Sequence, residues 1–313
     1  TMMAAALLLG MFKLAAGRLD LEKLASLASD PALHAPTLVL PLGVGASDSP
    51  DDTPVVFMHG MGDDGGNPGM QSLAKTVTAR YPRKYAVALR VADGMASILE
   101  PMDRQLAEFV AAVRADPRLA HGFDAVGLSQ GNLIVRAYVE RVNDPPVRRL
   151  VSVCGPQEGI GTCPNNPVYE LICPLWKLDK YGAGIAFSGY WKGVTDRAAY
   201  LAHNAFLPDI NNERAVKNET YRANMRRLEE YVLIEAEWDT MLVPRETSQH
   251  GFWPWGAEYG RLVPLEKSEG YAGDWIGLRS LSEAGRLRKL LFKGDHLRFS
   301  SEWWAEHVLP VFA

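Results

Sequence analysis

A serine between two glycines is the strongest chemical signal in this chain. Gly127-Leu128-Ser129-Gln130-Gly131 follows the short apolar run FDAV and precedes the helix-like run NLIVRAYVERV. Small residues two positions before and after a serine permit the tight strand-to-helix turn of a nucleophile elbow. The N-terminus of the following helix carries partial positive charge, which favours an oxyanion. The pattern predicts Ser129 as a nucleophile.

A nucleophilic serine needs a histidine base. Downstream of an elbow of this kind the chain order is serine, acid, histidine. His296 lies in KGDHLRFS, directly after the last apolar run and before a terminal helix, and is the predicted base. His250, in SQHGFW, is the alternative base. His203, in a predicted insertion, and His307, in the terminal helix, are predicted to be structural.

The histidine in turn needs a carboxylate to orient it. Asp239 ends the apolar run YVLIEAEWD, which places it at the carboxyl edge of a strand, the edge where the elbow also lies. Glu237 is the alternative acid. Asp295 is adjacent to His296 in sequence, and neighbouring side chains of an extended loop diverge, so we expect it to form or cap a turn.

The negative charge that develops on a substrate carbonyl needs two backbone N–H donors. Gln130, directly after the serine, supplies the first. Met61, in the segment HGMGD, is the predicted second donor, because the neighbouring glycines allow the backbone to approach a substrate closely. We expect His59, at the end of the preceding apolar run, to be structural.

These residues require a sheet that brings strand ends together. TPVVFMHG, YAVALRV, FDAVGLSQG, RRLVSVCG, EEYVLIEAEWD and KLLFKGDH read as buried strands, and amphipathic helical segments separate the first four. This alternation predicts a mostly parallel sheet with helices on both faces, in an α/β-hydrolase fold. The alternation of strands and helices stops at about residues 155–224, which we expect to form an inserted helical subdomain.

Composition limits the other possibilities. The chain has 313 residues, a formal net charge of −4 and no Lys/Arg-rich run, so we expect no nucleic-acid partner. It also lacks an apolar run long enough to span a membrane. We predict a catalytic domain over residues 54–313. Residues 1–53 are expected to be an N-terminal arm or a signal-like segment with a linker.

Five separated segments resemble the lysosomal palmitoyl-protein thioesterases over roughly residues 54–312. They are HGMGDDGGNPGM, GLSQGN, FLPDINNERAVKNETY, EWDTMLVP and GDHLRFSSEWW. The resemblance implies hydrolysis of long-chain (palmitoyl) acyl groups from S-acylated cysteines of proteins or peptides, with no cofactor and no metal. It assigns Ser129, Asp239 and His296 as the triad, and Met61 and Gln130 as the oxyanion hole. A lipase, a carboxylesterase or an acyl-CoA thioesterase with the same triad is the alternative.

The resemblance also gives the insertion a role, since the family uses this segment to shape an apolar acyl groove. Aromatic side chains of the insertion suit the wall of such a groove, although aromatic residues also serve plain core packing. The acyl-groove candidates are Trp176, Tyr181, Phe187, Tyr190 and Trp191.

Cysteines and a glycosylation sequon bear on the cellular compartment. Cys163 and Cys173 flank a loop-like stretch, so they either close a small disulfide or stay reduced, and the resemblance matches them to a family disulfide. Asn218 begins an N-glycosylation sequon at a position where the family is also glycosylated. Together they favour a lysosomal or secretory localisation. Cys154 is expected to be a packed thiol.

The chain departs from the mammalian members at two places where those proteins carry further cysteines. Gly65 and Gly66 replace adjacent cysteines after HGMGD, and Val110 and Val142 take the places of another pair. Two apolar side chains can fill the same space without oxidation. These departures weaken the inference about compartment but leave the chemistry unaffected.

Overall fold

The computed structural model describes residues 52–165, 169, 173–174, 181, 184–257 and 260–313. The predicted N-terminal arm therefore lies, up to residue 51, outside the described residues. Among the helices that are described, none is long and apolar enough to cross a membrane.

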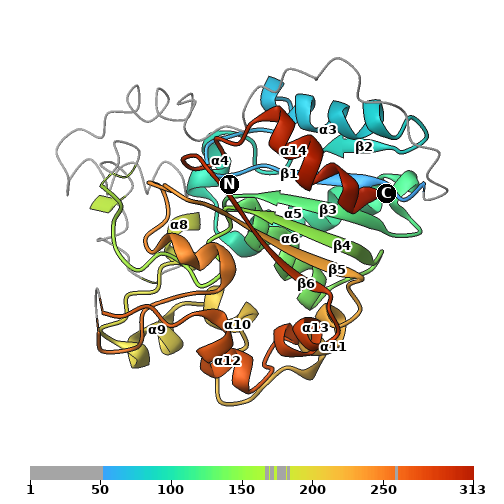
Figure 1. Cartoon of the computed structure of the whole chain (residues 1–313). Helices are drawn as coiled ribbons and strands as arrows, with labels where there is room; N and C mark the ends of the chain where they lie inside the picture. Colours follow the sequence, from blue (N-terminus) through green and yellow to red (C-terminus); the bar gives the residue numbers. More distant parts are fainter. Residues whose placement is uncertain (1–51, 166–168, 170–172, 175–180, 182–183, 258–259) are drawn as a thin grey trace.

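Six parallel strands form the sheet at the centre of the molecule (Figure 1). Their order is β2-β1-β3-β4-β5-β6, and each neighbouring pair is parallel. The predicted α/β-hydrolase sheet is confirmed. The inner strands β1 and β3 are buried along their whole length, which explains why their sequences are continuously apolar. The strands are β1 (Val55–Met58), β2 (Ala86–Ala88), β3 (Phe123–Leu128), β4 (Val147–Val153), β5 (Glu230–Ala236) and β6 (Leu287–Phe292).

Helices cover both faces of this sheet. On one face α3 (Pro68–Arg80) packs with α14 (Ser301–His307), and Trp304 of α14 contacts Phe57 of β1. On the other face α5 (Met102–Ala115) packs against α6 (Gly131–Arg141), where Tyr138 contacts Phe109 and Phe123. The helices therefore cover both faces of the sheet, as a parallel sheet requires. Aromatic side chains make the contacts named above.

Short helices occupy the long connections that follow β4 and β5. The segment expected as an insertion lies between β4 and β5. A second long connection, which we call the excursion after β5, lies between β5 and β6, and the sequence pattern did not distinguish it from the core. The first connection carries α8 (Ala186–Gly189), α9 (Arg197–His203), α10 (Leu207–Ile210) and α11 (Glu219–Met225). The second carries η2 (Arg245–Gln249), η3 (Leu265–Lys267), α12 (Glu269–Ala272) and α13 (Leu278–Glu283). The remaining short helices are α4 (Met95–Leu99), η1 (Pro117–Leu119) and η4 (Leu309–Phe312).

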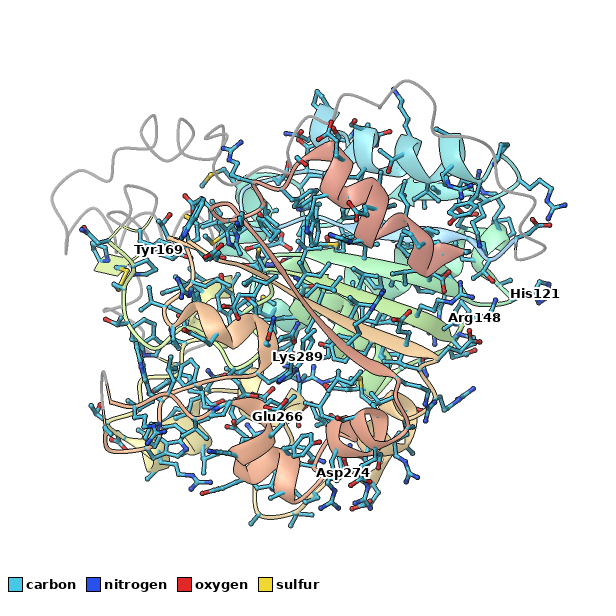
Figure 2. The ribbon with its side chains drawn as sticks, in the orientation of Figure 1. His121, Arg148, Tyr169, Glu266, Asp274 and Lys289 are labelled. Atoms are coloured by element: carbon cyan, nitrogen blue, oxygen red, sulfur yellow. A yellow bond between two sulfur atoms is a disulfide. The ribbon has the colours of Figure 1, made fainter. Side chains whose placement is uncertain are left out.

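The second excursion is attached to the edge strand β6. Lys289 of β6 forms an ion pair with Glu266 of η3, and the two side chains lie near one another in Figure 2. Gln249 Nε2 donates to the carbonyl oxygen of Leu290 over 3.0 Å. These contacts cover part of an edge strand that otherwise offers unpaired backbone groups.

A buried arginine attaches the first insertion to the core. Arg136 of α6 is fully buried, and its Nη2 donates to Gln157 O over 3.0 Å and to Asn211 Oδ1 over 2.7 Å. Its Nη1 pairs with Glu140 Oε1 at 3.2 Å. The helix that begins at the elbow therefore holds the segment that follows β4 at two places, Gln157 and Asn211.

The C-terminal helix fixes the loop that carries His296. Trp304 is fully buried, stacks on Phe299 with ring centroids 5.2 Å apart, and donates from Nε1 to Thr76 Oγ1 over 3.0 Å. Phe299 also contacts Phe292 at the end of β6. The loop between Phe292 and Phe299 is therefore held at both ends by one aromatic cluster.

We expect Trp304→Ala to lower the free energy of unfolding by about 3–5 kcal/mol, because it removes a fully buried indole and leaves a cavity. Urea denaturation followed by circular dichroism measures this change. Trp238→Ala is the matched control, since Trp238 is 58% exposed. It should change the unfolding free energy by less than about 1 kcal/mol. Equal effects of the two substitutions would contradict the anchoring role of Trp304.

Candidate active site

Ser129 lies at a sharp turn between β3 and α6. Its φ angle of 50° falls in the left-handed region, which residues other than glycine seldom adopt. Its backbone N–H donates to Val153 O over 2.9 Å, and its carbonyl oxygen accepts from Asn132 N over 3.1 Å. These bonds hold the strained conformation that a nucleophile elbow needs.

Close approach of neighbouring backbone explains the two glycines around this turn. A Cβ on Gly127 would lie 2.5 Å from Asn132 Cα, and one on Gly131 would lie 2.3 Å from His59 O. Both distances are shorter than any side chain tolerates, so the turn requires glycine at each position. Gly60 packs against Ser129 in the same way, since a Cβ there would be 3.0 Å from Ser129 Cβ.

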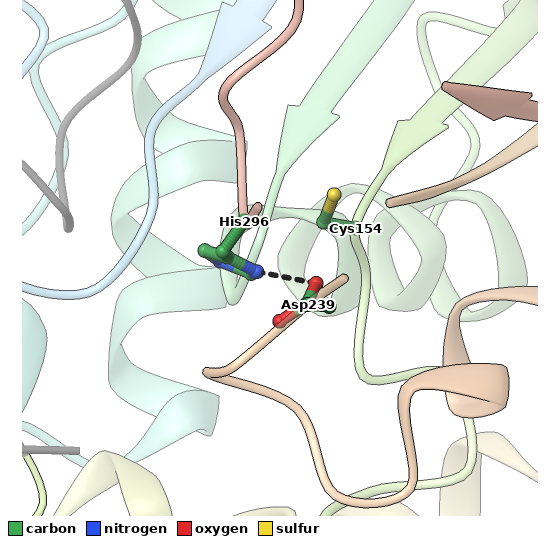
Figure 3. Close-up of side chains that lie close together, drawn as sticks. All are labelled: Cys154, Asp239 and His296. Carbon is green, nitrogen blue, oxygen red and sulfur yellow. Dashed lines mark hydrogen bonds and ion pairs between the residues drawn. The ribbon is translucent and has the colours of Figure 1, made fainter. Parts of the chain in front are cut away.

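The structure brings Ser129, His296 and Asp239 into one hydrogen-bonded chain. His296 Nε2 is 2.9 Å from Ser129 Oγ, and His296 Nδ1 is 2.7 Å from Asp239 Oδ2 (Figure 3 shows the second contact). Because a carboxylate only accepts, Nδ1 carries the proton and Nε2 is left to accept from the serine hydroxyl. The three side chains come from the ends of β3, β5 and β6, so the parallel sheet gathers them at one edge.

Asp239 is held through its second carboxylate oxygen. Oδ1 accepts from the backbone N–H groups of Met241 and Leu242 over 2.8 and 3.0 Å. The carboxylate thus has fixed donors on one side and His296 on the other. Such bonds orient an acid so that it holds one histidine tautomer.

Asp295 fastens the histidine loop to the acid loop. Its Oδ1 accepts from the Thr240 backbone N–H over 2.8 Å and from the His296 N–H over 2.7 Å. Its carbonyl oxygen also accepts from Arg298 N over 2.9 Å, which closes the turn expected at this residue.

The other sequence candidates have separate surroundings. His250 Nδ1 lies 2.9 Å from Glu158 Oε1, and the His307 ring packs edge-on against Trp303 at 5.0 Å. His203 ends the short helix α9. Glu237 lies two residues before Asp239, and the carboxylate that reaches His296 is that of Asp239.

Gln130, one predicted oxyanion donor, is fixed by its side chain. Nε2 donates to Ser97 O over 2.8 Å and to Gln105 Oε1 over 3.0 Å. Oε1 accepts from the Tyr190 hydroxyl over 2.9 Å. The same hydroxyl lies 3.6 Å from the sulfur of Met61, the other predicted donor. Contacts from α4, α5 and the insertion therefore converge on Gln130, and the insertion also contacts Met61.

The aromatic candidates of the insertion form a packed cluster. Phe187 is fully buried, and its ring contacts Tyr190 and Trp191 with centroids 5.4 and 5.7 Å away. Tyr181 packs against Tyr200, whereas Trp176 lies outside the described residues. Sequence reasoning placed Tyr190 only in an acyl groove and missed its bond to Gln130, because nothing in the sequence indicated that long-range contact.

Cys154 is a neighbour of the triad that the sequence did not reveal. Its Sγ, a carboxylate oxygen of Asp239 and a ring nitrogen of His296 lie within 4.8 Å of one another (Figure 3). Burial and the charge of Asp239 raise the pKa of the Cys154 thiol well above its usual value. The group therefore remains a neutral thiol, which is a poor nucleophile.

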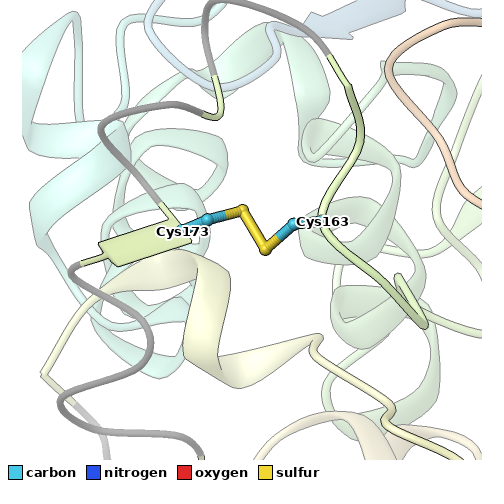
Figure 4. Close-up of a disulfide and its surroundings, with 2 residues drawn as sticks. All are labelled: Cys163 and Cys173. Atoms are coloured by element: carbon cyan, nitrogen blue, oxygen red, sulfur yellow. A yellow bond between two sulfur atoms is a disulfide. The ribbon is translucent and has the colours of Figure 1, made fainter.

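Cys163 and Cys173 form a disulfide, with Cα atoms 6.1 Å apart (Figure 4). The bridge predicted for these two cysteines is confirmed. Asn218, the predicted glycosylation site, is exposed, and its Oδ1 caps α11 by accepting from Thr220 N. The geometry leaves the amide nitrogen of Asn218 on the surface, and glycosylation of this residue stays a prediction.

The sequence model of the family described as palmitoyl protein thioesterase matches residues 54–296. The chain belongs to this family. Palmitoyl-protein thioesterase 3 of Dictyostelium discoideum is 37% identical over 75% of this chain and 81% of its own length. Palmitoyl-protein thioesterase 1 of Caenorhabditis elegans is 32% identical, over 78% and 86%.

The lysosomal thioesterase PPT2 homolog of Drosophila melanogaster is 28% identical over 75% of this chain and 82% of its own length. Family membership, together with the α/β-hydrolase sheet, supports thioester hydrolysis. The predicted resemblance to palmitoyl-protein thioesterases is therefore confirmed.

His59 binds the loop that contains Met61 to the segment after β2. Its Nδ1 lies 2.8 Å from Gly60 O, and its Nε2 lies 2.8 Å from Val91 O and 3.3 Å from Asp93 Oδ1. Because a carbonyl only accepts, making both bonds requires both ring nitrogens to be protonated. Burial opposes this charge, but the bonds to Asp93 and Gly60 and the charges of Asp63 and Asp93 outweigh it and raise the pKa of His59.

We expect His59 to stabilise the fold more at acidic than at alkaline pH. A raised pKa in the folded state means that the stabilisation is fully present below the unfolded pKa of about 6.5. It is lost as the pH rises through the folded pKa. Thermal unfolding of the wild type and His59→Asn between pH 5 and 9 tests this, and the Tm difference should shrink towards pH 9. A difference that is constant over this range would contradict the charged state.

Tyr190→Phe should lower kcat for thioester hydrolysis about 2- to 10-fold, the effect of one lost hydrogen bond of about 0.5–1.5 kcal/mol. The reason is that Gln130 loses one of the three contacts that hold its side chain. KM should stay nearly constant. Tyr200→Phe is the matched control, since Tyr200 is fully buried and its hydroxyl lies beside Glu213, with no hydrogen bond to Gln130. Equal kcat values for the two variants would exclude the positioning role.

Proposed function

We propose that this protein is a serine thioesterase that removes long-chain acyl groups, such as palmitoyl, from S-acylated cysteines of proteins or peptides. The observation that carries the proposal is the hydrogen-bonded chain from Ser129 through His296 to Asp239. Membership of the palmitoyl protein thioesterase family favours a thioester, rather than an oxygen ester, as the bond that is hydrolysed.

In the first step Ser129 Oγ attacks the thioester carbonyl carbon while His296 Nε2 takes the hydroxyl proton. The backbone N–H groups of Met61 and Gln130 stabilise the oxyanion of the tetrahedral intermediate. Asp239 stabilises the imidazolium that forms. Collapse of the intermediate breaks the C–S bond, and the thiolate leaves with the proton from His296.

In the second step a water molecule attacks the acyl-Ser129 ester. His296 takes a proton from this water, and a second tetrahedral intermediate forms in the same oxyanion site. Breaking the bond to Ser129 Oγ releases the fatty acid, and His296 returns the proton to the serine. A thiolate leaves readily, so we expect selectivity to depend on acyl recognition rather than on acid assistance.

The acyl chain would bind along the insertion. Phe187, Tyr190 and Trp191 form an apolar cluster whose Tyr190 contacts both proposed oxyanion residues. The cluster thus lies beside the residues proposed to hold the reacting carbonyl, which supports an acyl chain beginning at this point. Tyr181 and Trp176 remain proposed contributors to the same groove.

We place the protein in the lysosome or the secretory pathway. The Cys163–Cys173 disulfide suits an oxidising compartment. The exposed sequon at Asn218 is compatible with glycosylation, and several relatives are named lysosomal thioesterases.

Ser129→Ala should reduce hydrolysis of a palmitoyl-peptide thioester by about 10⁴-fold or more while leaving the thermal unfolding temperature nearly unchanged. Ser301→Ala, at the surface of α14, is the control and should retain full activity. Parallel assays with palmitoyl-CoA and a palmitoyl oxygen ester identify the preferred substrate. Retention of more than a few per cent of activity in Ser129→Ala would reject the nucleophile, and faster oxygen-ester cleavage would favour a lipase or carboxylesterase.

A further inference from the structure

Ser97 is a buried polar residue to which the proposed reaction gives no role. It lies in the short helix α4, between β2 and α5, and is only 1% exposed. Its hydroxyl group and its backbone carbonyl both form hydrogen bonds to other segments of the chain. One of these bonds leads to the loop with Met61 and the other to Gln130, the two residues proposed as oxyanion donors.

The hydroxyl group of Ser97 holds the loop that contains Met61. Ser97 Oγ lies 2.6 Å from Gly94 O, and because a carbonyl only accepts, the single hydroxyl proton is donated there. The same oxygen accepts from the backbone N–H of Gly62 over 2.7 Å. This N–H belongs to the peptide group that directly follows Met61. The bond therefore fixes the backbone on one side of the Met61 N–H.

A second hydrogen bond joins the same two segments. The Gly94 N–H donates to Asp63 O over 2.7 Å. The φ angles of Gly62 and Gly94 are 79° and 60°, in the left-handed region that glycine adopts without strain. Because two bonds join residues 62–63 to residues 94–97, loss of one would displace the loop slightly and leave it attached.

The backbone carbonyl of Ser97 holds Gln130. Its oxygen accepts from Gln130 Nε2 over 2.8 Å and from Gln105 Nε2 over 3.1 Å. Gln105 also donates to Glu100 O over 2.8 Å, and its Oε1 accepts from Gln130 over 3.0 Å. Gln105 is fully buried, so water does not compete for these bonds. α4 and α5 thus fix the residue whose N–H is the other proposed oxyanion donor.

An oxyanion hole acts only when its donors are correctly separated. Each N–H must lie about 2.7–3.1 Å from the position that the oxyanion occupies. Met61 follows β1 and Gln130 follows β3, so the distance between their N–H groups depends on contacts between separate segments. Ser97 supplies such a contact, because it bonds to Gly62 through its side chain and to Gln130 through its main chain.

We propose that Ser97 is a positioning residue for thioester hydrolysis, which sets the distance between the N–H groups of Met61 and Gln130. This inference rests on the proposed function, in which those two groups stabilise the oxyanion. The hydroxyl proton of Ser97 is committed to Gly94. Ser97 therefore acts through Gly62 and Gln130 and not directly on the substrate.

Ser97→Ala removes the hydroxyl group and keeps the backbone carbonyl. We expect kcat for a palmitoyl-peptide thioester to fall about 5- to 50-fold, less than the loss of about 10²–10³-fold that follows deletion of a whole oxyanion donor. KM should change by less than about 2-fold, because the charge on the carbonyl oxygen develops only in the transition state. Ser97→Thr keeps the hydroxyl group and should retain most of the wild-type kcat.

Inhibitor affinity separates this role from a general loosening of the fold. A palmityl trifluoromethyl ketone forms an oxyanion when Ser129 adds to its carbonyl, so its Ki should rise by about the factor by which kcat falls. A palmityl-peptide thioether has no carbonyl group and forms no oxyanion. Its Ki should be the same for the wild type and Ser97→Ala.

Ser280→Ala is the matched control. Ser280 Oγ donates to Asp274 Oδ2 over 2.5 Å, and the residue lies in α13, well away from α4 in Figure 1. The substitution removes the same atom and one hydrogen bond, and it should leave kcat and both Ki values unchanged. If Ser97→Ala fails to fold, Ser97→Cys replaces it, because sulfur fills the site but accepts only weakly, and kcat should again fall while the Ki of the ketone rises.

Wild-type kcat in Ser97→Ala, or a fall in kcat without a matching rise in the Ki of the ketone, would overturn the role of Ser97. An equal fall in kcat for Ser280→Ala would also overturn it. Each of these results leaves the proposed thioesterase intact, since the wild type is active in the same assay. A wild type that neither hydrolyses the thioester nor binds the ketone would instead reject the proposed function, and the role of Ser97 with it.

Discussion

The close contact between the start of α6 and the end of β1 is the constraint on which the site depends. Gly131 lies so near His59 O that no side chain fits there, and Ser129, two residues before it, has a left-handed backbone conformation. The close approach of β1 and α6 also brings Gly60 into contact with Ser129. The loop that contains Met61 therefore lies beside the elbow. One close backbone contact thereby joins the serine proposed as nucleophile to the backbone proposed to stabilise the oxyanion.

Much of the sheet could be predicted because its strands are short, apolar and separated by amphipathic helices. The run TPVVFMHG became β1 (Val55–Met58), and FDAVGL became β3 (Phe123–Leu128). The helices of the insertion were not predicted individually, since segments of four to seven residues are too short to show a helical period. For the same reason the excursion after β5 was not separated from the core.

The residues of the triad could be chosen because each follows an apolar strand, a feature that is local in sequence. The contacts of Tyr190 with Gln130, and of Cys154 with the triad, join positions far apart in the chain and have no local pattern. The charged cluster around Lys192 is of the same kind, because it combines Glu158, Glu213 and His250 from three separate loops. Sequence reasoning therefore found groups placed by secondary structure and missed those placed by packing.

The side chain of Gln130 is held by three segments that fold around the core at different places: Ser97 after β2, Gln105 in α5 and Tyr190 in the insertion. A chain with a complete sheet but an undocked insertion would already have Ser129, His296 and Asp239 close together. It would still lack one of the contacts that fix the oxyanion site. Full activity would then be the last property acquired during maturation, so a partly folded molecule would be a slower enzyme until the insertion has docked.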